Sequence, residues 1–108
     1  MPIVTVELVA DPDRPLERNL TQSLADTVGR VLSSAPGQTW VRLRLLPRDG
    51  YAENDALMEA AELPVFVTLL ERQLPTGVEL TSEVTALTHA IAQAIGRPAT
   101  CVHIGLFG

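Results

Sequence analysis

The chain has 108 residues, of which 46% are hydrophobic and 19% are charged, and its formal net charge is −5. A chain of this length forms one domain, so residues 1–108 are treated as a single unit. The acidic balance argues against binding to nucleic acid or to an anionic membrane surface. The single cysteine, Cys101, precludes an internal disulfide and fits a reducing compartment. Neither a membrane span nor a signal peptide is recognisable, so we expect a cytoplasmic protein.

The first half of the chain predicts a strand, a helix and a second strand. Residues 2–6 are rich in β-branched side chains, and residues 39–46 alternate between apolar and polar side chains, as strands do. Asp13 stands two residues before Pro15, and proline is favoured in the first turn of a helix, so a helix is expected to begin there. This helix is expected to end at residues 35–37. Its apolar stripe consists of Leu16, Leu20, Leu24, Val28 and Val31.

The second half predicts the same order of elements, beginning with a strand over residues 63–68. Thr76 and Glu79 have the spacing of a capping box at a helix start. The helix stops at residues 96–98, and a strand over residues 100–106 follows. The apolar stripe of this helix consists of Leu80, Val84, Leu87, Ile91 and Ala94.

Short sequence matches show that the two halves repeat each other. The strand that begins at Pro2 recurs at Pro64, 62 residues later. The triplet at residues 41–43 matches the triplet at residues 102–104 at an offset of 61. An internal repeat of this kind indicates a duplicated structural unit.

The chain is therefore expected to be an α+β protein built from two β-α-β units. Repeat one covers residues 1–46, a linker covers residues 47–62, and repeat two covers residues 63–108. Each crossover pairs its strands in parallel, so the units form a four-stranded mixed sheet with both helices on one face. Residues 47–50 have turn chemistry, and residues 55–62 are expected to form a short helix.

The opposite face of the sheet has an unusual composition. Strand alternation places Trp40, Arg42 and Arg44 together on that face, and the repeat adds His103. One reading is that the two arginines are ordinary surface residues. The other is that this uncovered face is the contact surface of an oligomer.

These features resemble the tautomerase superfamily, which includes 4-oxalocrotonate tautomerase and macrophage migration inhibitory factor. The chain opens with a proline, Pro2, directly after the initiator methionine, and Arg42 lies in the second strand. The duplicated β-α-β architecture matches the longer members. The resemblance covers the whole chain and implies a homotrimer with a cofactor-independent keto–enol tautomerase activity.

The resemblance also implies roles for individual residues. Removal of Met1 would leave Pro2 as the terminal amine and the catalytic acid/base, acting on a small enol or 2-oxo acid that bears a carboxylate. Guanidinium groups bind carboxylates in bidentate geometry and favour the neutral form of a nearby amine. The candidate substrate-binding residues are Arg42, Arg14, Arg72, Arg44 and Tyr51.

No metal site and no cofactor are expected, because the two histidines and one cysteine have no metal-ligand spacing. Dehalogenase and decarboxylase members carry further acid or histidine groups, which have no equivalent at Thr27, Val28, Gln38 or Thr39. Two other hypotheses remain open. One is a non-catalytic tautomerase-like binding or assembly module, which retention of Met1 would favour. The other is a ferredoxin-like regulatory domain with a different strand order.

Overall fold

One four-stranded sheet forms the framework of the computed structural model, which describes residues 2–57 and 63–108. Strand β1 (Ile3–Val9) pairs in parallel with β2 (Trp40–Leu46), and β3 (Val65–Leu70) pairs in parallel with β4 (Val102–Phe107). Antiparallel pairing of β1 with β3 joins the two units, so the strand order is β2-β1-β3-β4. The α+β class and the mixed sheet predicted from the repeat are confirmed.

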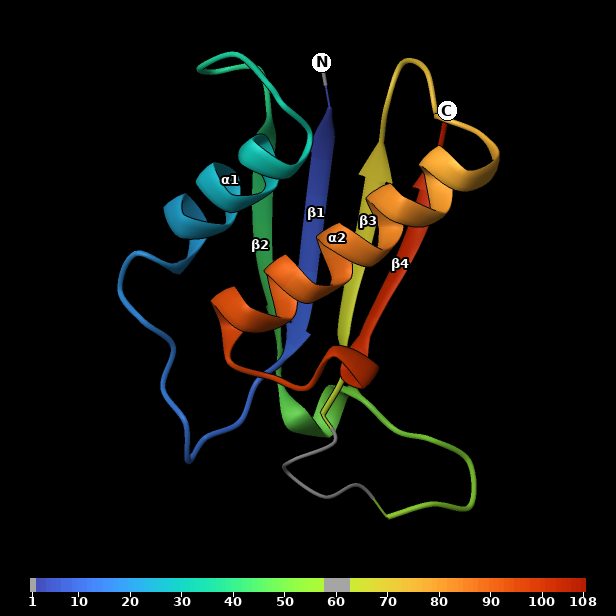
Figure 1. Ribbon diagram of the computed structural model, residues 1–108. Coiled ribbons are helices and arrows are strands. Elements are labelled where there is room, and N and C mark those ends of the chain that lie inside the picture. The colour runs from blue at the N-terminus through green and yellow to red at the C-terminus, as the bar shows by residue number, and fades with distance from the viewer. Residues whose placement is uncertain (1, 58–62) are drawn as a thin grey trace.

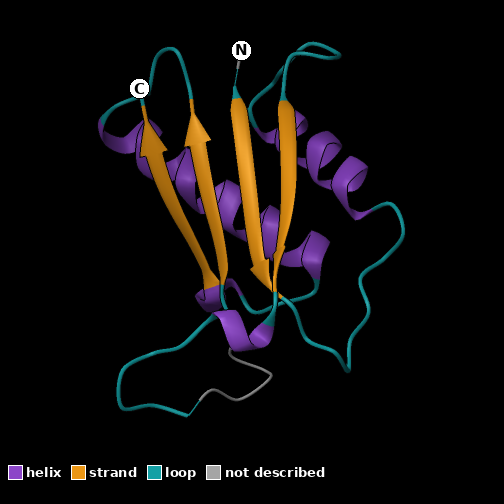
Figure 2. Ribbon diagram, turned by 180° about the vertical axis from the view of Figure 1, so that it is seen from behind, coloured by secondary structure: helices purple, strands orange, loops and turns teal. Residues whose placement is uncertain are grey.

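Both helices lie on the same face of the sheet. Figure 1 shows α1 (Leu20–Val31) over the β2 side and α2 (Gly77–Ile95) running across the sheet, and Figure 2 shows the opposite face without a helix. Burial follows strand alternation, because one side chain in two faces the helices. The fully buried core residues of the strands and helices are Val4, Val6, Leu8, Val9, Leu24, Val28, Val65, Leu69, Leu87 and Ile91.

The predicted start of the first helix at Asp13 and Pro15 is wrong, because α1 begins at Leu20. Upstream, the carboxylate of Asp11 accepts a hydrogen bond from the backbone N–H of Asp13 at 3.0 Å. Its carbonyl accepts another from the N–H of Arg14 at 3.1 Å. Local aspartate hydrogen bonds of this kind hold the backbone in a turn and compete with the helix.

The second helix begins and ends as its sequence signals predict. Thr76 is the residue before α2, although its side chain makes no capping hydrogen bond, so the predicted capping box is not formed. Gly96 follows the helix with φ of 82°, a left-handed conformation that glycine adopts without strain. The last strand begins later than predicted because a short 3-10 helix, η3 (Ala99–Cys101), precedes it.

The linker contains another 3-10 turn, η1 (Arg48–Gly50), where the sequence predicts turn chemistry. Residues 55–57, where the expected short helix would begin, are not helical. The rest of that predicted helix, residues 58–62, lies outside the described residues, as does Met1.

Arg97 connects the two repeats at the end of the sheet where β1 finishes. Its guanidinium donates to the carbonyl of Val9 at 2.6 Å and to the carbonyls of Leu63 and Pro64 at 3.3 and 3.4 Å. Burial lowers the pKa of Arg97, and the carboxylate of Asp11 opposes this effect. A planar fork of donors can satisfy several carbonyls at once, which a lysine cannot do in the same geometry.

We predict that Arg97→Ala lowers the free energy of unfolding by about 2–3 kcal/mol, because hydrogen bonds from a charged group are lost and partly buried carbonyls lose their donor. Urea titration of the purified variant measures this loss. Arg18→Ala is the matched control, since Arg18 is exposed, and its stability should stay within about 0.5 kcal/mol of wild type. Equal stabilities for the two variants would contradict the role assigned to Arg97.

Candidate functional site

Pro2 lies at the entry to β1, at the end of the sheet where β3 finishes (Figure 1). Its carbonyl accepts a hydrogen bond from the backbone N–H of Trp40 at 3.0 Å, so β2 holds it in place. Pro2 is half-buried, and the adjacent Trp40 is 51% exposed. A rigid, partly desolvated position of this kind suits a group that must exchange protons with a small molecule.

Arg42 and Arg44 lie on the uncovered face of the sheet, as strand alternation predicts. In the register of the sheet, Arg42 is opposite Thr5 and Arg44 is opposite Glu7. The Arg42 guanidinium donates to the Thr5 hydroxyl at 3.2 Å, and both arginines are exposed. Most of their hydrogen-bonding capacity is therefore directed away from the hydrophobic core.

The remaining candidate residues lie at opposite ends of the sheet. Arg72 follows β3 and is exposed at the same end as Pro2. Arg14 follows β1 and Tyr51 follows β2, so both lie at the far end. At about 3.3 Å per residue, the length of β1 separates that end from Pro2 by roughly 20 Å. The fold thus brings Pro2 and Arg72 to one end of the sheet but not Arg14 or Tyr51.

Tyr51 belongs to a row of rings at the far end of the uncovered face. Its ring centroid lies 5.8 Å from that of Phe66, which in turn lies 5.8 Å from that of His103. The Tyr51 hydroxyl donates to the carboxylate of Glu53 at 2.7 Å. This hydrogen bond raises the pKa of Tyr51, because it stabilises the protonated phenol.

The sequence reasoning missed two carboxyl groups near Pro2. Glu71 directly follows β3, and Glu83 lies on α2. Burial raises the pKa of Glu71, and the nearby carboxylate of Glu83 raises it further. The available signal was the spacing of Glu83, Leu87 and Ile91, which places an acidic residue on the buried stripe of the helix.

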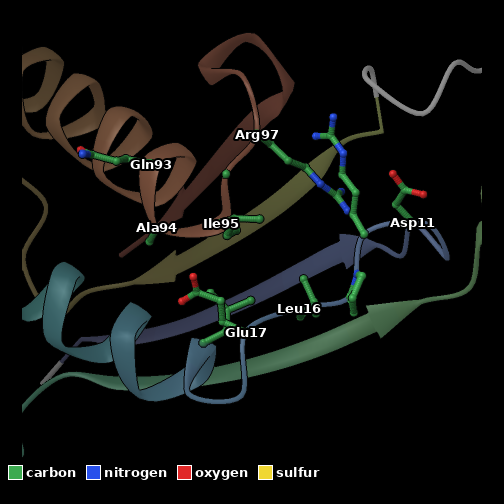
Figure 3. Close-up of a pocket in the computed structure, with 11 residues that line it drawn as sticks. Asp11, Leu16, Glu17, Gln93, Ala94, Ile95 and Arg97 are labelled. Atoms are coloured by element: carbon green, nitrogen blue, oxygen red, sulfur yellow. The ribbon is translucent and has the colours of Figure 1, made fainter.

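A cavity of about 260 Å³ lies between the end of α2 and the segment before α1. Figure 3 shows Asp11, Glu17 and Arg97 among the residues that line it. Arg14 also contributes to this cavity, but Pro2 and the other candidate residues do not. The guanidinium of Arg97 is already occupied by three backbone carbonyls, so this cavity has a structural arginine at its edge.

Among residues 2–57 and 63–108, no group of three or more histidine, cysteine or acidic residues is placed to hold a metal ion. The same residues include no helix that is long and apolar enough to cross a membrane. Cys101 is buried, as expected for a small packed side chain.

The comparisons with known proteins rest on structure, since no family model and no curated protein matches the sequence. The macrophage migration inhibitory factor of Trichinella spiralis superposes with a TM-score of 0.70 at 16% identity, covering 98% of this chain and 88% of that one. A wild-type fused 4-OT, described as a symmetric trimer, superposes with a TM-score of 0.66 at 16% identity, covering 96% of this chain and 82% of that one. The FG41 malonate semialdehyde decarboxylase superposes with a TM-score of 0.65 at 18% identity, covering 96% of this chain and 80% of that one.

The chain has the tautomerase fold. The resemblance noted in the sequence is confirmed at this level, and the four-stranded sheet with its two helices matches these neighbours over nearly the whole chain.

Proposed function

We propose that this tautomerase-fold protein is a cofactor-independent keto–enol tautomerase acting on a small enol or 2-oxo acid that bears a carboxylate. The observation that supports this most strongly is the position of Pro2, half-buried at the entry to the central strand β1 of a duplicated β-α-β fold. One structural neighbour was inactivated by 2-oxo-3-pentynoate, which is a small 2-oxo acid. The cytoplasmic location remains a prediction from the sequence.

In this proposal, Met1 is removed and the secondary amine of Pro2 transfers a proton to or from the carbon beside the carbonyl. A rigid amine at a strand end keeps its lone pair in one orientation, which favours proton transfer to a bound substrate. Arg42 and Arg72 are the best-placed candidates for the substrate carboxylate, because both are exposed and neither guanidinium is engaged by a carboxylate among the described contacts. Arg44, Arg14 and Tyr51 would act only across a subunit boundary.

We also propose that the protein forms a homotrimer through the uncovered face of its sheet. Two fused 4-OT neighbours are described as trimers. The face carries Trp40, Leu70 and Phe107 at 51%, 43% and 56% exposure, although large apolar side chains are ordinarily removed from water. Assembly through this face would bring arginines of one subunit toward the Pro2 end of another.

A non-catalytic binding or assembly module is the second candidate. It is favoured by the separation of Pro2 from Arg14 and Tyr51 within one subunit, since a substrate cannot bridge roughly 20 Å. The activity of the trimer decides between the two candidates.

We predict that Pro2→Ala lowers kcat/KM for phenylpyruvate or 2-hydroxymuconate ketonisation by at least about 100-fold, because the acid/base is lost. Wild type and variant are prepared without Met1, and mass spectrometry verifies each N-terminus. Activity of the variant equal to that of wild type would show that the proposed mechanism is wrong.

For the carboxylate, Arg42→Ala and Arg72→Ala should each lower kcat/KM by about 10- to 100-fold, the range expected when a charge-assisted hydrogen bond is lost. The methyl ester of the same substrate should be nearly insensitive to either substitution. Arg18→Ala serves as a control with full activity. An equal loss with acid and ester would argue against carboxylate recognition by these arginines.

The assembly is tested by introducing a charge on the uncovered face. Trp40→Glu should lower the association constant by at least about tenfold, because a buried unpaired carboxylate is costly. Light scattering after gel filtration gives the mass as a function of concentration. Val78→Glu is the matched control, since Val78 is 82% exposed on α2, which lies on the opposite face of the sheet. A monomeric wild type, or dissociation caused by Val78→Glu alone, would contradict this interface.

A further inference from the structure

The backbone places Glu71 directly across from Pro2. Ile3 pairs with Leu70 in the antiparallel ladder, so the next residues outward on the two strands, Pro2 and Glu71, lie opposite one another. The N–H of Glu71 donates to the carbonyl of Phe107 at 3.0 Å. This bond extends the ladder beyond β3 and holds the Glu71 backbone in an extended position at the end of the sheet.

The side chains of Glu71 and Glu83 meet on the helix-covered side of the sheet. Alternation along β3 buries Val67 and Leu69 under the helices, and Glu71 continues that series. Glu83 precedes the buried Leu87 by one helical turn on α2. Both carboxyls have one oxygen, Oε2, that is closed to solvent and has no hydrogen-bond partner among the described residues.

Two carboxyls that share a site give up their protons in separate steps. The first proton leaves readily, and the second is held because a second negative charge beside the first is unfavourable. The raised pKa of Glu71, caused by burial and then by Glu83, agrees with this arrangement. Negative charge on this pair lies next to the position of the Pro2 amine, because Glu71 is opposite Pro2 in the ladder.

The other charged groups around this end of the sheet are more exposed. Arg72 follows Glu71 and Glu79 lies one turn before Glu83, and both side chains are exposed. Arg30, near the end of α1, is also exposed and lies 3.4 Å from the Thr27 hydroxyl. The adjoining ends of β2 and β4 carry Trp40 and Phe107, which are uncharged. The paired carboxyls are therefore the least solvated charges near Pro2 among the described residues.

We propose that the facing carboxyls of Glu71 and Glu83 hold the Pro2 amine in its protonated form, so that Pro2 acts first as a general acid. This inference rests on the proposed function and revises the expectation that arginines keep the amine neutral. In ketonisation, the Pro2 N–H bond breaks as a C–H bond forms on the enol. The hydroxyl O–H electrons form the carbonyl, its proton passes to water, and Pro2 regains a proton from water. Glu71 and Glu83 are positioning residues, since they act through Pro2.

The test is an NMR titration of Met1-free protein labelled with ¹⁵N-proline, which follows Pro2 directly and needs no substrate. The double variant Glu71→Gln/Glu83→Gln, which removes both carboxyls, should lower the pH at which Pro2 loses its proton by about one unit, a roughly tenfold loss of proton affinity. Each single variant retains one carboxylate beside Pro2 and should shift the titration less than the double variant, and the pH profile of kcat/KM should move with the Pro2 titration. Glu79→Gln, on the same helix but exposed, should leave the titration unchanged.

A Pro2 titration that is the same in the Glu71→Gln/Glu83→Gln double variant and in wild type would overturn this inference. So would an equal shift in Glu79→Gln, because the effect would then be one of general surface charge. The proposed function fails by a different result, full activity of Pro2→Ala. The two failures are distinguishable, because the titration reports on the amine whether or not the protein is an enzyme.

Discussion

The antiparallel pairing of β1 with β3 is the constraint on which the rest of the structure depends. Each β-α-β unit covers one face of only two strands, and a two-stranded sheet is marginal by itself. Pairing the inner strands of both units buries Val6 against Val67 and forms one core. The same pairing brings the start of β1 to the end of β3. Pro2 therefore meets residues of the second repeat.

That junction also explains why the two repeats are not equivalent. Pro64 occupies the position of Pro2 in the second repeat, but it is buried, and its carbonyl accepts hydrogen bonds from the N–H of Val9 and from Arg97. An internal proline has no ionisable amine. His103 replaces Arg42 at the corresponding strand position, with a ring that stacks on Phe66. The duplication thus supplies a framework whose two halves place different residues at equivalent positions.

Charge is distributed in a way that the net value does not reveal. Arg42 and Arg44 project from the uncovered face. Glu71 and Glu83 lie on the helix-covered side near Pro2, and each has one carboxyl oxygen closed to solvent. A cation near an amine favours its neutral form, and a carboxylate favours its protonated form. Glu71 lies opposite Pro2 in the ladder, and Glu83 lies beside Glu71. Arg42 and Arg72 are the candidates for the substrate carboxylate. Substrate binding would then depend on the arginines, and the proton affinity of Pro2 would depend on the carboxylates.

The sequence by itself determined the class of fold, because strand alternation, helical stripes and the repeat are local patterns. It also predicted the shared face of Trp40, Arg42 and Arg44, since alternation fixes sidedness without knowledge of strand order. The catalytic role of Pro2 stays a prediction. The start of α1 was misjudged because local hydrogen bonds of Asp11 outweigh the helix signal at Pro15. Only the tertiary structure decided that Glu71 lies opposite Pro2 and that Arg14 lies at the far end. Those relations depend on how strands distant in the chain pair, and no local pattern specifies that pairing.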